Sequence, residues 1–463
     1  MKYISTRGQM EPIGFQDAVM TGLAPDGGLL LPESIPQVAE HLEEWATLSY
    51  TELAFEIISL FADDIPPAEL AELIANSYAS FDTPEVTPLV ELGDLFLLEL
   101  FHGPTLAFKD VALQFLGNLF EYILQQRGGH LNILGATSGD TGSAAIHGVR
   151  GKADINIFIM YPNGRTSPLQ ERQMTSVLDK NVFNLAVDGT FDDCQRIMKT
   201  IFADTDFKTT HSLGSINSVN WARVLAQTVY YFYSAFRAME RTNSKQVRFA
   251  VPTGNFGDIL AGYLAQKMGL PIQKLILATN ENDILSRFFN TGTYAQSKVC
   301  PTLSPSMDIQ VASNFERYLY YALNEDADAL RALMDTFHSE GTLSLKPQAD
   351  GIIDPLFAAG RGDTESTLAT IKKYHQKHNY ILDPHTAVGV KVAEDFMDSS
   401  APTICLATAH PAKFPAAIQQ AINEEIHHPT LDALANAETR NTPIVPQVET
   451  IKSFLLQKIG NSV

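Results

Sequence analysis

Short apolar segments alternate with amphipathic helical patterns through most of the chain, and this alternation limits the possible folds more than any other feature. After residue 96, three apolar segments indicate buried strands: 131–134, 155–160 and 182–187. Helical patterns lie between and after them, near residues 141–149, 169–178 and 191–202. Buried strands that alternate with helices form a parallel sheet covered on both faces. The sequence therefore predicts an α/β fold.

The second half of the chain repeats this alternation after a polar linker at residues 241–246. Its apolar segments are 247–251, 275–279 and 404–407. We expect a helix-rich insertion at about residues 300–380 and a separate N-terminal domain before residue 96. The predicted domains are therefore residues 1–95, 96–240 and 241–463, with two α/β halves of mostly parallel strands.

Charge and cysteine content narrow the partners and the compartment. The net charge of -20 argues against nucleic acid or an anionic membrane surface as a partner. An anionic small substrate would then need locally placed arginine or lysine. The three cysteines are scattered and lack metal-ligand spacing, which is typical of reduced thiols. No signal peptide or membrane-spanning run is recognisable, so we expect a cytoplasmic protein.

Lys109 stands at a distinctive position. An apolar run at residues 95–101 breaks at His102-Gly-Pro, and an amphipathic helical pattern begins immediately after Lys109. The partial positive charge of a helix N-terminus and apolar neighbours both favour a neutral, nucleophilic amine. Taken alone, an ordinary first-turn lysine that reaches solvent is the more frequent explanation.

Two glycine-containing loops follow predicted strands. The segment Thr253-Gly-Asn-Phe-Gly-Asp258 lies between a strand and a helical pattern, where exposed N–H groups and the helix dipole would bind phosphate. The segment Thr137-Ser-Gly-Asp-Thr141 offers hydroxyl and amide donors to a carboxylate. Glycine-rich loops are common in any α/β sheet, and the second segment would also serve as an ordinary helix N-cap.

A nucleophilic lysine, a phosphate loop and a carboxylate loop on two α/β halves suit pyridoxal phosphate acting on an amino acid. With these motifs in place, the sequence resembles the threonine synthase family, of the longer bacterial and fungal type, whose fold is shared with the tryptophan synthase β chain. The resemblance covers nearly the whole chain. It rests on eight ordered motifs at residues 3–8, 22–29, 98–110, 137–142, 215–223, 252–258, 304–308 and 408–414.

The resemblance implies a fold-type II enzyme in which the two halves enclose pyridoxal phosphate. Lys109 would bind the cofactor covalently and carry protons, and Thr408 would hydrogen-bond the pyridine nitrogen. The cofactor phosphate would be held by Gly254, Asn255, Phe256, Gly257 and Asp258. The substrate carboxylate would be bound by Thr137, Ser138 and Thr141. The substrate phosphate would be bound by Asn217, Ser218 and Arg223, the last of which would otherwise form a surface salt bridge.

Asp140 departs from the wider superfamily, which commonly has asparagine near the phenolic oxygen of the cofactor. A carboxylate beside a phenolate is repulsive, so Asp140 is expected to be protonated, turned away or bound elsewhere in the loop. We include it among the cofactor-proximal residues. His102, His410 and Lys413 flank the motifs and would add positive charge, although lone residues of this kind are more often structural.

The implied reaction converts O-phospho-L-homoserine and water to L-threonine and phosphate, by γ-elimination followed by β-addition of water, as the last step of threonine biosynthesis. The alternative is a phospho-lyase of the same fold that releases 2-oxobutanoate and phosphate. A non-catalytic descendant would be expected to lack the lysine or the phosphate loop, and both are present. We expect no metal and a monomer or weak homodimer.

Overall fold

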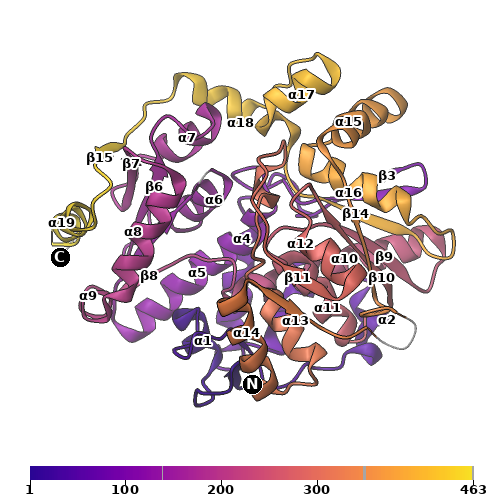
Figure 1. Cartoon of the computed structure of the whole chain (residues 1–463), viewed down its shortest axis with the longest axis horizontal. Helices are drawn as coiled ribbons and strands as arrows, with labels where there is room; N and C mark the ends of the chain where they lie inside the picture. Colours follow the sequence, from indigo (N-terminus) through magenta and orange to yellow (C-terminus); the bar gives the residue numbers. More distant parts are fainter. Residues whose placement is uncertain (138, 348–350, 461–463) are drawn as a thin grey trace. The chain divides into compact units, whose positions relative to one another are not determined.

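The computed structural model describes residues 1–137, 139–347 and 351–460. The chain forms two structural units, each built from separated segments (Figure 1). The first unit contains Met1–Ala75, Phe81–Phe108 and Ser218–Ile426. The second contains Asn76–Ser80, Lys109–Asn217 and His427–Val463. These units are not the three consecutive ranges expected from the sequence, because both include strands that are distant in the chain.

The first unit is organised around a six-stranded sheet in the order β13-β10-β9-β14-β4-β3. All neighbours pair in parallel except β3 and β4, which are antiparallel. The mostly parallel arrangement confirms the predicted α/β class. The strands are β3 (Leu89–Leu92), β4 (Leu95–Glu99), β9 (Val247–Pro252), β10 (Ile272–Thr279), β13 (Phe357–Arg361) and β14 (Thr403–Ala407).

Strand β4 lies in a different sheet from the one expected. The sequence places this apolar run at the start of the first α/β half, whereas the structure pairs Phe96 with Ile404 of β14. Periodicity identifies a buried strand but not its neighbour, since pairing depends on which distant apolar surface it completes. The pairing of β4 with β14 is therefore known only from the tertiary structure.

Helices of the first unit pack on this sheet and on one another. Helix α16 (Pro384–Asp395) contacts β9, β10 and β14, and α15 (Thr364–His378) packs against α16. Figure 1 shows both near β14. Val388 of α16, Ala250, Ile276 and Cys405 belong to one buried apolar cluster. The long helix α10 (Trp221–Thr242) contacts α11 (Gly257–Lys267) and α3 (Tyr50–Ser59). This packing fixes the ends of β9 and β14, from which the candidate site residues project.

The remaining elements of the first unit are short. β1 pairs with β2 and β11 pairs with β12, both antiparallel. The helices that begin in this unit are α1 (Phe15–Thr21), α2 (Leu42–Trp45), α3 (Tyr50–Ser59), α4 (Pro67–Tyr78), α10 (Trp221–Thr242), α11 (Gly257–Lys267), α12 (Ile284–Thr291), α13 (Phe315–Ala322), α14 (Ala327–Glu340), α15 (Thr364–His378), α16 (Pro384–Asp395) and α17 (Pro415–Ile422). The short strands are β1 (Tyr3–Ser5), β2 (Leu30–Pro32), β11 (Thr293–Ala295) and β12 (Thr342–Ser344).

The second unit has a five-stranded sheet in the order β15-β7-β6-β5-β8, and all its pairs are parallel. Its strands are β5 (Leu131–Ala136), β6 (Ile155–Pro162), β7 (Val182–Val187), β8 (Leu213–Gly214) and β15 (Thr442–Ile444). Its helices are α5 (Lys109–Arg127), α6 (Asp140–Val149), α7 (Pro168–Thr175), α8 (Phe191–Ala203), α9 (Thr205–Thr210), α18 (Pro429–Asp432) and α19 (Val448–Ile459).

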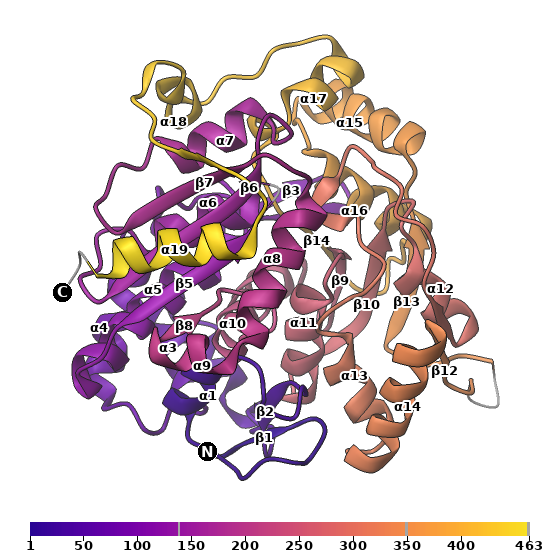
Figure 2. The same ribbon diagram turned by 60° about the vertical axis from the view of Figure 1, so that its left-hand side comes forward.

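One face of this sheet is covered by α8 and α19, which lie in front of it in Figure 2. Phe158 and Leu185 from the strands, Ile197 from α8 and Leu455 from α19 share one buried cluster. The C-terminal segment thus completes a sheet whose other strands come from the middle of the chain. Across the described ranges, no helix is long and apolar enough to cross a membrane.

Helices α5 and α6 meet in backbone contact, which positions the residues at their N-termini. A Cβ atom placed on Gly117 of α5 would lie 1.9 Å from the carbonyl oxygen of Gly148 in α6. A Cβ atom on Gly148 would lie 2.5 Å from the carbonyl oxygen of Leu113. Only glycine permits this approach. The two helices that begin at Lys109 and Asp140 are therefore held in one fixed register.

Candidate active site

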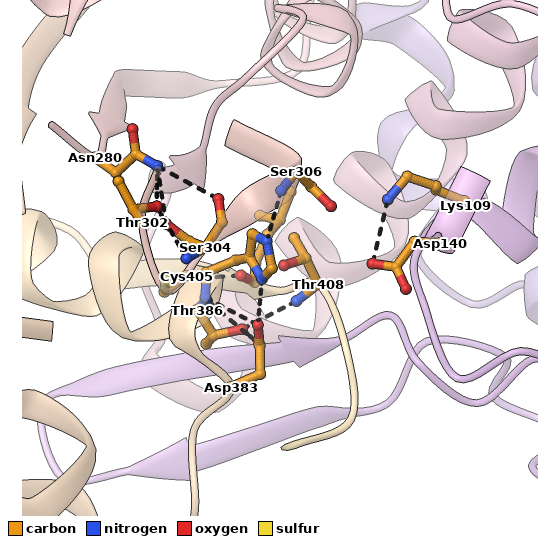
Figure 3. A network of polar contacts seen from close by, with 12 residues as sticks. Lys109, Asp140, Asn280, Thr302, Ser304, Ser306, Asp383, Thr386, Cys405 and Thr408 are labelled. Carbon is orange, nitrogen blue, oxygen red and sulfur yellow. Dashed lines mark hydrogen bonds and ion pairs between the residues drawn. The ribbon is translucent and has the colours of Figure 1, made fainter. Parts of the chain in front are cut away.

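Lys109 is the first residue of α5, at the helix N-terminus that the sequence predicts. The residue is 8% exposed, and its Nζ lies 3.8 Å from Oδ2 of Asp140 (Figure 3). Asp140 is itself the buried first residue of α6. The structure therefore brings together two of the residues singled out from the sequence, a buried amine and a buried carboxylate.

The turn before Lys109 contains a strained residue. Leu106 is buried and has a φ of 59°, which is rare for a side chain of this size. Its N–H donates to the carbonyl of Gly103, and Nζ of Lys413 donates to the carbonyl of Thr105 at 2.7 Å. Strain of this kind persists only where neighbouring contacts hold it, and it concentrates at functional sites. Lys413 thus fixes the turn that leads into Lys109.

The position of Asp140 answers one of the open questions from the sequence. Its Oδ1 accepts a hydrogen bond from Nε2 of Gln170 at 2.9 Å, while Oδ2 faces Lys109. The carboxylate is therefore bound to α7 and directed towards the lysine. Gln170 was not anticipated, because nothing in the local sequence around Pro168 indicates contact with residue 140.

The loop before α6 uses its own hydroxyl for internal bonds. Oγ1 of Thr137 accepts hydrogen bonds from the N–H groups of Gly139 and Gly142, each at 3.0 Å. Gly139 occupies the N-cap position of α6, and Thr137 satisfies a first-turn N–H from two residues earlier in the loop. Thr141 is half-buried in the first turn of α6. Ser138 lies outside the described residues.

The predicted phosphate loop links β9 to α11, as the sequence indicates. Phe256 occupies the N-cap position with a φ of 63° and makes no side-chain capping bond. Its ring is buried among aromatic side chains, with Phe289 and Phe315 at centroid distances of 6.1 and 5.3 Å. This packing holds a backbone conformation that costs free energy. The first N–H groups of α11 have no partner within the helix, which suits an anion.

Gly254, in the same loop, packs tightly against the turn at residues 304–307. A Cβ atom on Gly254 would lie 2.8 Å from the carbonyl oxygen of Ser306. The carbonyl of Asn255 accepts hydrogen bonds from Asn314 through both its backbone N–H, at 3.0 Å, and its Nδ2, at 3.2 Å. Gly257 adjoins the same Asn314 side chain. The loop is thus shaped by neighbours from the 304–314 segment.

Asp258 has a role that the sequence does not reveal. Its Oδ1 accepts hydrogen bonds from the hydroxyls of Tyr230 and Tyr231 on α10, at 2.5 and 3.0 Å. Burial raises the pKa of Asp258 to about 6, against the opposing effect of the two hydroxyls. A side chain held in this way leaves only the backbone N–H of Asp258 for a phosphate.

The third predicted cluster lies near the start of α10. Arg223 is buried, and burial lowers its pKa to about 10, so the guanidinium stays protonated at neutral pH. Ser218 and Asn220 belong to the same unit: Ser218 accepts a hydrogen bond from Asn314 at 3.0 Å, and Asn220 caps α10. Asn217 belongs to the second unit, where its Nδ2 donates to Ser215 at 3.2 Å. Burial excludes the surface salt bridge considered for Arg223.

Thr408 directly follows β14, as the sequence indicates, and is 6% exposed. Its N–H donates to Oγ1 of Thr386 at 3.1 Å, and its carbonyl accepts the N–H of Phe108 at 2.8 Å. Within the described ranges, its hydroxyl makes no hydrogen bond to the protein. The backbone of Thr408 is therefore fixed on both sides, whereas its side chain is available to a ligand.

His102 and His410 have structural contacts. The His102 ring lies between Glu99 and Asp82, with its nitrogens 2.9 and 2.6 Å from their carboxylates. Burial alone would lower the pKa of His102, but these two hydrogen bonds raise it above its usual value. His410 caps the short helix at residues 411–413 through its Nδ1.

These residues fit pyridoxal phosphate. A buried lysine at a helix N-terminus supplies the amine that the cofactor aldehyde requires, and α11 presents N–H groups to a phosphate without a side-chain cap. The available Thr408 hydroxyl suits a pyridine nitrogen. Among the described residues no cluster of histidine, cysteine or carboxylate side chains has the arrangement of a metal site.

Family comparisons agree with this chemistry along the chain. The family model described as Threonine synthase N terminus matches residues 2–78, and the one described as Threonine synthase, C-terminal matches residues 386–455. The model described as Pyridoxal-phosphate dependent enzyme matches residues 81–344. Together they include every candidate site residue named above.

Individual relatives are similar over almost their whole length. Threonine synthase of Saccharomyces cerevisiae is 52% identical, covering 91% of this chain and 89% of the relative. That of Pseudomonas aeruginosa is 45% identical, covering 99% and 98%. The structure of pyridoxal-phosphate-bound threonine synthase from Brucella melitensis is 46% identical, with a TM-score of 0.95 and 99% coverage of both chains. The chain therefore belongs to the threonine synthase family of pyridoxal-phosphate-dependent enzymes.

Proposed function

We propose a role for each site residue in the threonine synthase reaction, in which O-phosphohomoserine and water give threonine and phosphate. The observation that carries the proposal is the buried, protonated Arg223 in a protein with a net charge of -20. A phosphorylated substrate needs a desolvated cation, and a guanidinium fork matches a phosphate. Arg223 binds the substrate phosphate, with Asn217 and Ser218 as further polar contacts.

The cofactor is held by three elements. Lys109 binds it covalently, and the backbone of residues 254–258 receives its phosphate at the N-terminus of α11. The Thr408 hydroxyl contacts the pyridine nitrogen. Because a neutral hydroxyl stabilises a pyridinium less than a carboxylate does, this site favours the unprotonated ring. When bound, pyridoxal phosphate supplies the electron sink that stabilises negative charge at the substrate carbons.

Proton transfer falls to Lys109. Once the substrate amine has displaced it from the cofactor, Nζ of Lys109 would take the proton from the substrate α-carbon and return one at the end of the reaction, which is general acid–base catalysis. Asp140, 3.8 Å away, stabilises the protonated amine while it holds this proton. Thr141 and the loop shaped by Thr137 bind the substrate carboxylate. Ser138 is proposed to bind the same carboxylate.

The proposed partner is a small phosphorylated amino acid, with neither nucleic acid nor membrane involved. A cytoplasmic location and a monomeric or weakly dimeric state are also proposals. They are checked by fractionation of the source cells and by sedimentation of the purified enzyme.

The decisive experiment is one incubation with O-phosphohomoserine in which threonine, phosphate and 2-oxobutanoate are all quantified. Equal amounts of threonine and phosphate are expected. Equal amounts of 2-oxobutanoate and phosphate, without threonine, would identify the phospho-lyase instead. The Arg223→Leu variant, incubated in parallel, tests whether phosphate recognition depends on this side chain.

A further inference from the structure

Asp383 is a buried carboxylate for which neither the family motifs nor the proposed reaction provides a role. Its side chain is fully buried, and it caps α16 by accepting the N–H groups of His385 at 2.9 Å and Thr386 at 3.3 Å. It also contacts Nδ1 of His385 at 2.9 Å and accepts the hydroxyl of Thr386. Four donors thus converge on one carboxylate, which matches its four acceptor positions.

One arm of this network leads to Thr408. Since the Thr386 hydroxyl directs its hydrogen to Asp383, its lone pairs face the other way. There Oγ1 accepts the N–H of Thr408 at 3.1 Å. The carbonyl of Thr408 is held by Phe108, the residue before Lys109. Figure 3 shows Asp383, Thr386 and Thr408 close together, with dashed lines for these hydrogen bonds.

The other arm leads to the phosphate loop. With Nδ1 of His385 directed at Asp383, Nε2 is left to act as an acceptor. It accepts the N–H of Ser306 at 3.2 Å. The carbonyl of Ser306 is the atom that a Cβ on Gly254 would approach to 2.8 Å. The His385 arm therefore sets the wall against which Gly254 packs.

We propose that Asp383 is a positioning residue that fixes the pyridine and phosphate ends of the cofactor site through Thr386 and His385. The inference rests on the proposed roles of Thr408 and the 254–258 loop. One buried carboxylate orients a hydroxyl and an imidazole so that each accepts a backbone N–H of the site. An amide in its place would have one acceptor oxygen in place of two and could not direct all four donors.

The Thr386 arm is tested with a pair of variants and a control. Thr386→Val keeps the shape but removes the acceptor for the Thr408 N–H, whereas Thr386→Ser keeps the hydroxyl. Thr370→Val is the control, because Thr370 is a buried threonine of α15 whose hydroxyl donates to the carbonyl of Ser366 within its own helix. The cofactor is removed from each purified holoenzyme, and the resulting apoprotein is titrated with pyridoxal phosphate. The absorption spectrum of the bound cofactor is then recorded. We expect Thr386→Val to raise the dissociation constant about tenfold or more and to change the spectrum. Thr386→Ser and Thr370→Val should resemble the wild type.

The His385 arm predicts a different signature. His385→Phe keeps the ring contact with Phe414 and removes both nitrogens. Because this arm shapes the phosphate end, the variant should lose affinity for pyridoxal phosphate about tenfold and lose little for pyridoxal. Thr386→Val should lose affinity for both compounds by a similar factor. The ratio of the two affinities therefore separates the arms.

Three results would overturn the inference. The first is an unchanged cofactor spectrum and affinity in Thr386→Val, even if the apoprotein unfolds at lower temperature. The second is an equal effect of Thr386→Ser and Thr386→Val, which would assign the loss to packing. The third is an unchanged affinity ratio in His385→Phe. The variant Thr408→Val distinguishes rejection of this inference from rejection of the proposed function. If Thr408→Val changes the cofactor spectrum and Thr386→Val does not, only the role of Asp383 is rejected. If neither Thr408→Val nor Thr386→Val does, the assignment of Thr408 falls as well.

Discussion

Helices α11 and α16 belong to the same unit, and their N-termini are stabilised differently. At α16 the chain supplies its own anion, since Asp383 accepts the N–H groups of His385 and Thr386. At α11 the N-cap residue Phe256 makes no side-chain capping bond, and the carboxyl in the first turn, Asp258, is bound by Tyr230 and Tyr231. A helix N-terminus attracts negative charge in either case. The N-terminus of α16 is therefore satisfied by the chain itself, whereas that of α11 is open to the anionic ligand that we propose for it.

The largest effect is expected when the carboxylate of Asp383, which caps α16, is removed. Asp383→Ala leaves four buried donors without their acceptor and should lower the free energy of unfolding by about 3–5 kcal/mol. The measurement is the urea midpoint of the apoprotein. Asp326→Ala is the matched control, because Asp326 caps α14 through two backbone N–H groups at an exposed position. That control should cost about 1 kcal/mol. Equal losses would show that Asp383 is an ordinary cap.

The next largest effect is expected at Arg223, the residue proposed to bind the substrate phosphate. Arg223→Leu should reduce kcat/KM for O-phosphohomoserine by about 30- to 4,000-fold, because truncation of a buried phosphate contact costs about 2–5 kcal/mol. Binding of pyridoxal phosphate should be unchanged, and inorganic phosphate should no longer inhibit. Arg237→Leu, on the same helix, changes an arginine that stacks on Tyr233 and should leave kcat/KM unaltered. Retention of full efficiency by Arg223→Leu would remove the main local support for a phosphorylated substrate.

A smaller effect, dependent on pH, is expected at the start of α11. The pKa of Asp258 is raised to about 6 in the folded protein, above its value in the unfolded chain, so the folded state binds the extra proton. The free energy of unfolding should therefore fall as pH rises from about 4 to 6, by roughly 2–3 kcal/mol from this group, and level off above. Asp258→Asn keeps the oxygen that accepts both tyrosine hydroxyls and should lack this decline. Urea midpoints at pH 4 and pH 7 test it; parallel changes in both proteins would contradict the assignment.

The smallest effect is expected at a helix without any site. Helix α8, in the second unit, begins with a capping box in which Thr190 and Asp193 bond each other's N–H groups. Thr190→Ala should lower the free energy of unfolding by about 1 kcal/mol, and cofactor affinity and kcat/KM should stay at wild-type values. A change in cofactor affinity would mean that capping anywhere in the chain affects the site, which would weaken the distinction drawn for α11 and α16.

Part of the fold and of the candidate site can be predicted from particular residues in the sequence. The start of α5 at Lys109, the loop between β9 and α11, and the position of Thr408 after β14 follow from local apolar periodicity and turn residues. The pairing of β4 with β14 and of β15 with β7 does not, because both join segments more than 200 residues apart. Periodicity describes which face of an element is apolar and not what covers it.

By itself, the sequence determined the class of fold, the place of Lys109 at the start of a helix, the glycine-containing loop before α11 and the family, since each depends on residues adjacent in the chain. Only the tertiary structure decided how those residues are held. Gln170 reaches Asp140, Tyr230 and Tyr231 bind Asp258, and Asp383 supports Thr408 through Thr386. These contacts join residues up to 30 positions apart, through hydrogen bonds to buried groups that no longer have water as a partner. Such bonds are specified by packing in three dimensions, so a local pattern cannot reveal them.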